Sequence, residues 1–126
     1  MMDLTGFQPF DFSIGSPSVT ITNRGVTFNQ ATVKRLNMAE YVQLLINHEE
    51  GQVAVRSCSK DDEKATSFYR PKKSGVMFVR WNRSGLLYAL EQFLGSGLAA
   101  HGFRVNGRQI DANTILFDFR KAKPLG

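Results

Sequence analysis

The stretch that decides the fold is VTITNRGVTFNQATVKRLNMAEYVQLLINHEEGQVAVR, residues 19–56. Its first ten residues alternate apolar with polar side chains on either side of Asn23-Arg24-Gly25, which is a turn sequence. Alternation of this kind, rich in β-branched residues, is typical of half-buried strands. A tight hairpin of strands 19–22 and 26–28 is therefore predicted.

A short helix and a second hairpin are predicted to follow. Asn29 is a suitable N-cap for a helix over residues 30–36, and Asn37 is a suitable end. Residues 41–46 form a mostly apolar run whose length favours a buried strand. After a polar loop, residues 52–56 alternate again and form the return strand.

Residues 59–75 break this pattern, because a charged run and a turn-rich basic segment replace the alternation. They are expected to connect two halves of the domain, with a short strand within residues 66–70. The second half then begins with residues 76–81, which are apolar at nearly every position. A strand without a polar face is typical of the middle of a sheet, so a central strand is predicted there.

The clearest helix of the chain is predicted over residues 84–94, where leucine and phenylalanine recur at helical spacing on one face. Ser84 is the expected N-cap. Gly95 and Gly97 are expected to end the helix, because glycine readily adopts the left-handed conformation that closes a helix.

The C-terminal part predicts more strands. Asn106-Gly107 is the strongest two-residue hairpin signal, so residues 103–110 are expected to form a strand pair around it. A last strand is expected over residues 115–120. The basic tail 121–126 is expected to fray. At the other end of the chain, residues 1–18 contain alternating phenylalanines and predict an extended arm.

These elements predict one α+β domain over residues 1–126, since 126 residues fit a single domain. Its main part is an antiparallel β-sheet with one short helix and one longer amphipathic helix. The order of elements suggests a strand–helix–hairpin pseudo-repeat. The expected parts are the N-terminal arm (1–18), the first half (19–58), the charged connector (59–75), the second half (76–120) and the tail (121–126).

A family resemblance is carried by residues 21–56, which run strand, glycine turn, strand, short helix ending in leucine, and two strands around an acidic loop. The positions concerned are Gly25, Val26, Phe28, Lys34, Leu36 and the loop 47–51. In this order of elements the segment resembles the AbrB/SpoVT/MazE swapped-hairpin module, a small dimeric DNA-binding fold. The resemblance implies a homodimer and a nucleic-acid partner.

The composition excludes several classes of protein. Cys58 is the single cysteine, so a fold held by internal disulfides is excluded. No apolar run approaches the roughly 20 residues that span a bilayer, so no membrane association is expected. The first residues lack the basic and apolar stretches of a signal peptide. A soluble, cytoplasmic protein is therefore expected.

The charge is unevenly distributed along the chain. Residues 1–63 hold five basic and eight acidic side chains, a net charge of −3. Residues 64–126 hold eleven basic and three acidic side chains, a net charge of +8. Such an imbalance produces a positive potential that attracts polyanions if the cations share one surface.

Residues for catalysis or metal binding are few. His48 and His101 lie far apart in predicted loops, without the spacing of a metal site. Cys58 ends a predicted strand and is expected to be a small buried residue, because no nearby base is identified. The acidic run 61–63 lacks the ligand spacing of a calcium loop. We therefore expect no enzymatic activity, no metal and no cofactor.

Nucleic acid is the better-supported partner, because basic residues are interleaved with aromatic ones in the second half. Cations bind backbone phosphates, and unpaired bases stack on aromatic rings, so the mixture suits single strands of DNA or RNA on a sheet. Taken singly, each aromatic residue is better interpreted as core. The candidate nucleic-acid-binding residues are Arg70, Lys72, Lys73, Arg80, Trp81, Arg83, Arg104 and Arg108.

Two functions are consistent with the sequence. The first is a non-catalytic nucleic-acid-binding or regulatory domain that uses this basic, aromatic-interleaved sheet surface. The alternative is a protein-interaction or assembly module without nucleic-acid binding, in which the aromatic arm or an unpaired sheet edge contacts a partner. Convergence of the basic residues on one surface would favour the first.

Overall fold

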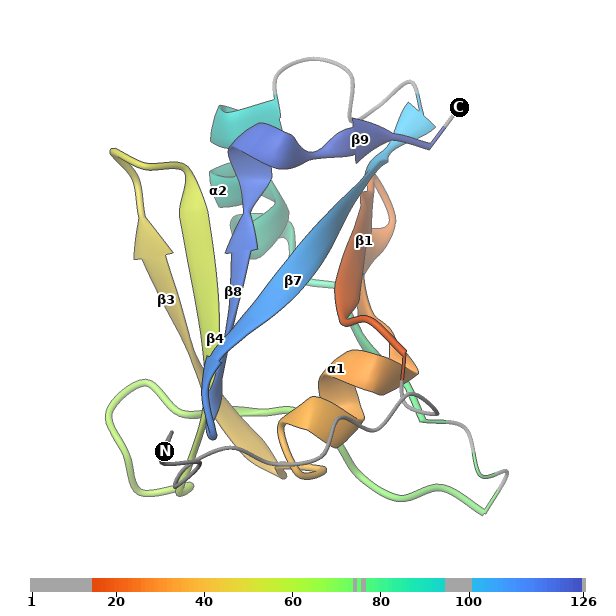
Figure 1. The fold of residues 1–126 in the computed structure, drawn as a ribbon, viewed down its shortest axis with the longest axis vertical. Helices are drawn as coiled ribbons and strands as arrows, with labels where there is room; N and C mark the ends of the chain where they lie inside the picture. The colour runs from red at the N-terminus through yellow and green to blue at the C-terminus, as the bar shows by residue number, and fades with distance from the viewer. Residues whose placement is uncertain (1–14, 74, 76, 95–100, 126) are drawn as a thin grey trace, which may run out of the picture.

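The computed structural model describes residues 15–73, 75, 77–94 and 101–125. The predicted arm therefore lies outside the described residues as far as residue 14, as do Gly95 and Gly97. The elements, drawn in Figure 1, are β1 (Ser18–Thr22), β2 (Gly25–Phe28), α1 (Gln30–Arg35), β3 (Tyr41–Asn47), β4 (Gln52–Cys58), β5 (Thr66–Ser67), β6 (Val79–Trp81), α2 (Ser84–Leu94), β7 (Phe103–Asp111), β8 (Thr114–Asp118), the 3-10 turn η2 (Phe119–Lys121) and β9 (Lys123–Pro124).

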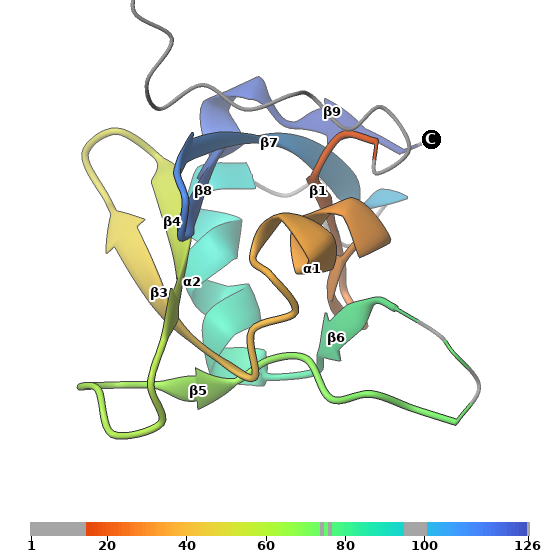
Figure 2. The same ribbon diagram turned by 60° about the horizontal axis from the view of Figure 1, so that its bottom comes forward.

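The strands form one sheet in the order β5-β3-β4-β8-β7-β1-β2-β6, with β9 paired to β7. Every pairing is antiparallel. Viewed as in Figure 2, the sheet curls into a half-barrel around the core. The prediction of an α+β fold that is mainly antiparallel sheet is confirmed, while the pseudo-repeat stays a prediction.

The first predicted hairpin and helix are confirmed. The Asn29 side chain accepts a hydrogen bond from the Thr32 amide (3.0 Å), as an N-cap does. It also accepts one from the Ser18 amide (3.0 Å), which fixes the start of α1 to β1. The strand expected at residues 41–46 is present as β3, but it is buried on one face only, and Leu45 is 40% exposed.

Strand β7 joins the two parts of the sheet and corrects the predicted hairpin at Asn106-Gly107. Residues 103–106 pair with β1, and residues 107–111 pair with β8, so the strand continues through Gly107. A Cβ atom on Gly107 would lie 2.7 Å from side-chain atoms of both Ile115 and Phe117. Gly107 therefore permits close packing inside a strand, which glycine in a sheet often does. The chain turns later, at residues 112–113.

The predicted central strand at residues 76–81 is an edge strand. Only Val79–Trp81 forms β6, and within the described residues β6 pairs with β2 alone. The apolar residue Phe78, which suggested burial on both faces, is 44% exposed. Apolar content alone could not distinguish a central strand from an edge strand beside a groove.

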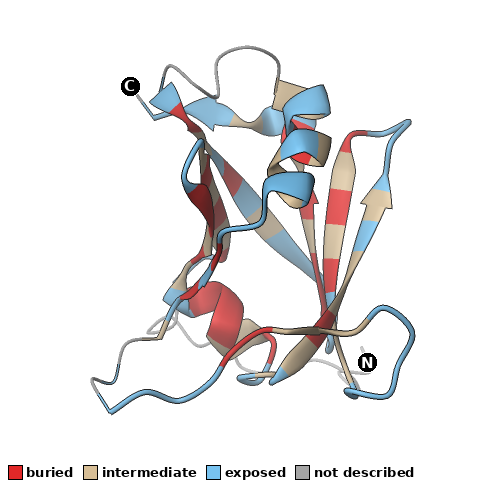
Figure 3. Ribbon diagram, turned by 180° about the vertical axis from the view of Figure 1, so that it is seen from behind, coloured by how far each residue is buried: buried red, intermediate tan, exposed pale blue. Residues whose placement is uncertain are grey.

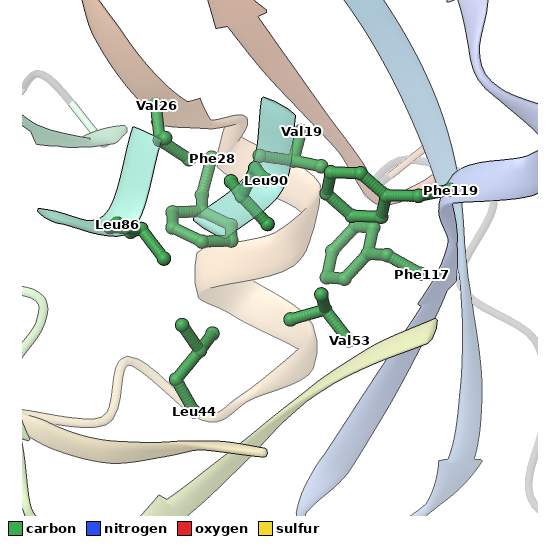
Figure 4. A pocket seen from close by; sticks show the side chains of 9 residues that line it. All are labelled: Val19, Val26, Phe28, Leu44, Val53, Leu86, Leu90, Phe117 and Phe119. Atoms are coloured by element: carbon green, nitrogen blue, oxygen red, sulfur yellow. The ribbon is translucent and has the colours of Figure 1, made fainter. Parts of the chain in front are cut away.

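The helices enclose the core from two directions. In Figure 2, α1 covers one end of the half-barrel, and in Figure 3 α2 lies across its open side. Figure 4 shows apolar side chains of the sheet, of α2 and of η2 converging around Phe28, Leu90 and Phe117. The cavity between them measures about 10 Å³, enough for one water at most, so these side chains pack as core and leave no room for a ligand among them.

The structure corrects the predicted start of α2 and the predicted fraying of the C-terminal tail. Ser84 is the first helical residue of α2, and the carbonyl of Arg83 accepts the first helical hydrogen bond, from Leu87 (3.1 Å). The tail does not fray in its described part, because Lys123 and Pro124 pair with β7 and the Leu125 amide donates a hydrogen bond to the Gly102 carbonyl (3.2 Å). None of the helices in the described ranges is long and apolar enough to cross a membrane.

Candidate nucleic-acid interface

The half-barrel does not close, and its end strands β5 and β6 face each other across a seam (Figure 2). Trp81 bridges this seam, since its indole Nε1–H donates a hydrogen bond to the Ser67 carbonyl (3.2 Å). A groove of about 380 Å³ lies along the seam. We call it the seam groove, and its charged and aromatic lining residues are Phe68, Arg70, Lys72, Phe78, Arg80, Trp81 and Arg83.

One wall of the seam groove is the segment that follows β5. Phe68 and Tyr69 are buried, and their amides donate hydrogen bonds to the carbonyls of Glu40 (2.8 Å) and Ala39 (3.1 Å). These bonds hold the backbone just before Arg70. Beyond it, the Gly75 amide donates to the Lys72 carbonyl (3.0 Å), which closes a turn. The backbone of this wall is therefore held to the rest of the domain as far as Tyr69, directly before Arg70.

The other wall is β6 and the start of α2. Val79 and Trp81 point inward and are buried, so the side chain between them, Arg80, points outward. The Arg83 guanidinium lies 5.3 Å from the centre of a Trp81 ring, a distance typical of cation–π contact. The alternation of inward and outward side chains in β6 thus directs the Arg80 side chain outward, and contact with the Trp81 indole positions the Arg83 guanidinium.

The three aromatic residues of the seam groove differ in accessibility, and Phe68 is buried. Trp81 is 6% exposed and packs edge-on against Phe28, so it is a core residue and offers no free face to a base. Phe78, which sequence reasoning assigned to the core, is 44% exposed. The Lys72 ammonium lies 5.9 Å from its ring centre. The accessible aromatic ring at this site is therefore that of Phe78.

Few carboxylates oppose these cations. Arg70 lies 3.8 Å from Glu40, and both side chains are more than half exposed, so the pair contributes little. The other ion pairs among the described residues join Arg120 to Glu50 and Asp118, away from the seam groove. In the described part of the chain, no carboxylate pairs with Lys72, Arg80 or Arg83, and the groove keeps a net positive charge.

Three further predicted residues lie outside the seam groove. Lys73 is exposed beside Lys72 in the same loop, and Arg104 and Arg108 are exposed on β7. Arg104 and Arg80 lie on one line across the sheet, because successive strand pairings connect them. The same pairings place Thr20, Thr27 and Lys123 on this line. Sequence reasoning missed these last three residues. The alternation marked both threonines as polar-face residues, but no local signal gives the pairing of strands so distant in sequence.

The thiol of Cys58, the single cysteine, is poorly suited to nucleophilic catalysis. Burial and the nearby Asp62 carboxylate raise the pKa of the Cys58 thiol, and Arg56 opposes this only in part. A raised pKa keeps the thiol protonated and weakly nucleophilic at neutral pH. Among the described residues, no three His, Cys, Asp or Glu side chains lie close enough together to hold a metal ion.

Comparison of the chain with protein-family models, with curated proteins and with solved structures finds no match. The resemblance of residues 21–56 to the AbrB/SpoVT/MazE module therefore stays a prediction. What the structure itself defines is an α+β half-barrel with a basic groove along its open seam.

Proposed function

We propose that this protein is a non-catalytic nucleic-acid-binding domain that takes unpaired nucleotides in the seam groove. The observation that carries the proposal is that Arg70, Lys72, Arg80 and Arg83 line one groove together with the exposed ring of Phe78. Cations along such a groove bind the phosphate backbone, and an exposed aromatic ring stacks on any of the bases. A protein with these features binds single strands without strong sequence preference.

The phosphate contacts can be tested by charge reversal on one wall of the groove. Arg80→Glu combined with Arg83→Glu is expected to weaken binding of a fluorescein-labelled oligothymidylate about tenfold or more, because two phosphate contacts become repulsive. Fluorescence anisotropy at about 50 mM salt measures the dissociation constant. Circular dichroism verifies that the variant is folded.

The matched control reverses two cations of the loop between β4 and β5. Lys60 and Lys64 are exposed, and Lys60→Glu with Lys64→Glu changes the net charge by the same amount. This control is expected to bind nearly as well as the natural chain. Equal weakening in both variants would show a general charge effect and contradict a site at the seam groove. Absence of binding by the natural chain would remove the proposed function altogether.

The stacking contact is tested separately, without a change of charge. Phe78→Ala is expected to weaken single-strand binding by about 1–3 kcal/mol, the usual loss for one stacked base. Binding of a duplex of the same sequence is expected to change little, because its bases are already stacked on each other. A Phe78→Ala variant that binds single strands as tightly as the natural chain would contradict base stacking at this ring.

A further inference from the structure

We propose that the bound strand leaves the seam groove at Arg80 and continues across the outer face of the sheet as far as β9. The proposal rests on the proposed function and extends it to a second tract of the same ligand. The tract is a line of residues, here called the outer row, with one member on each of five neighbouring strands. The outer row is Arg80, Thr27, Thr20, Arg104 and Lys123.

Strand register places these residues on one line. Arg80 is the pairing partner of Thr27, Thr27 of Thr20, Thr20 of Arg104, and Arg104 of Lys123. Partners directly opposite each other in antiparallel strands point to the same face of the sheet. Their neighbours along the strands, such as Val26 and Val105, are buried, so the face concerned is the outer one.

The outer row is continuous with the seam groove because Arg80 belongs to both. Neighbouring strands lie about 4.8 Å apart, so Arg104 is about 14 Å and Lys123 about 19 Å from Arg80 along the sheet. A distance of this size accommodates several nucleotides. The row therefore lengthens the groove into a path of the size that single-strand binding folds use.

The side chains of the outer row are available to a ligand. Arg80, Arg104 and Lys123 are exposed, and none of them forms an ion pair with a described carboxylate. Thr20 and Thr27 are half-buried, and their hydroxyls make no hydrogen bond to another described residue. The short threonine side chains between the longer arginine and lysine side chains leave space for a strand on the sheet surface. Hydroxyl groups are also common donors to phosphate oxygens. The row thus offers donors at each step from β6 to β9.

The test is the dependence of affinity on strand length. The probes are labelled oligothymidylates of about 4, 8 and 12 nucleotides, within the usual range of site sizes. In the natural chain the affinity is expected to rise about tenfold or more from the shortest probe to the longest, as the outer row becomes engaged. Arg104→Glu is expected to keep the affinity for the shortest probe and to lose most of this rise. Arg104→Gln, which only removes the charge, is expected to lose part of it.

Arg108→Glu is the matched control. Arg108 is a candidate from the sequence, but it lies outside both the seam groove and the outer row; it is exposed on the same strand as Arg104 and pairs with Leu116. It is expected to keep the rise. A rise that survives in Arg104→Glu, or that Arg108→Glu loses equally, would overturn the outer row. So would an affinity in the natural chain that does not grow with length. In these cases the shortest probe still binds, whereas failure of the proposed function abolishes its binding too.

Discussion

Raising the salt concentration from about 50 to about 200 mM is expected to weaken binding of a long single-stranded oligonucleotide about 300-fold. The seam groove and the outer row together supply the six cations Arg70, Lys72, Arg80, Arg83, Arg104 and Lys123. Each phosphate contact with a single strand contributes about −0.7 to the slope of log K against log salt, so a slope of about −4 is expected. Anisotropy titrations at several salt concentrations measure it.

A variant separates this effect from a general response to ionic strength. Loss of two phosphate contacts in Arg80→Glu with Arg83→Glu is expected to reduce the slope to about −3 or less in magnitude, whereas Lys60→Glu with Lys64→Glu is expected to leave it near −4. A slope close to zero in the natural chain would show that the cations do not contact phosphates, even if an oligonucleotide binds.

The second large effect is expected on stability. Phe117→Ala is expected to lower the free energy of unfolding by about 3–5 kcal/mol, because the cost of a large cavity adds to the lost burial. The Phe117 ring is fully buried, and its centre lies 6.0 Å from that of Phe28. Since domains of this size are stable by about 5–15 kcal/mol, the variant is expected to be close to unfolding. Urea denaturation followed by circular dichroism measures the difference.

The neighbouring residue provides the control. Leu116 is adjacent to Phe117 on β8 but points to the opposite face and is only half-buried. Leu116→Ala is expected to cost about 1 kcal/mol or less, as substitutions near the surface usually do. Similar losses in both variants would contradict the placement of Phe117 in the interior of the half-barrel.

Local patterns predicted the elements of the first half well. The turn at residues 23–25 and the cap at Asn29 are decided by neighbouring residues, so the sequence contains their signals. The predictions failed where contacts with a distant part of the chain determine the local structure. Asn106-Gly107 is a hairpin signal, but the approach of Ile115 and Phe117 makes Gly107 a packing position within a strand.

The sequence indicated which residue types the candidate site contains, but only partly which of these residues lie together on the surface. Four cations of the interleaved pattern, Arg70, Lys72, Arg80 and Arg83, line the seam groove together. The same pattern could not show that Trp81 is buried while Phe78 is exposed, because this depends on where the half-barrel stays open. Nor could it identify Thr20 and Lys123, whose places follow from the register of β1 and β9 on β7.

The position of β7 between β8 and β1 also bears on how the chain folds during synthesis. The first hairpin emerges early, yet the strand that links it to β8 and the rest of the sheet is separated from it by about 80 residues. Contacts so distant in sequence form late and slow the folding of a domain. The nascent chain therefore exposes incomplete sheet edges until its C-terminal strands are made, and the surface that joins β6 to β9 is completed last.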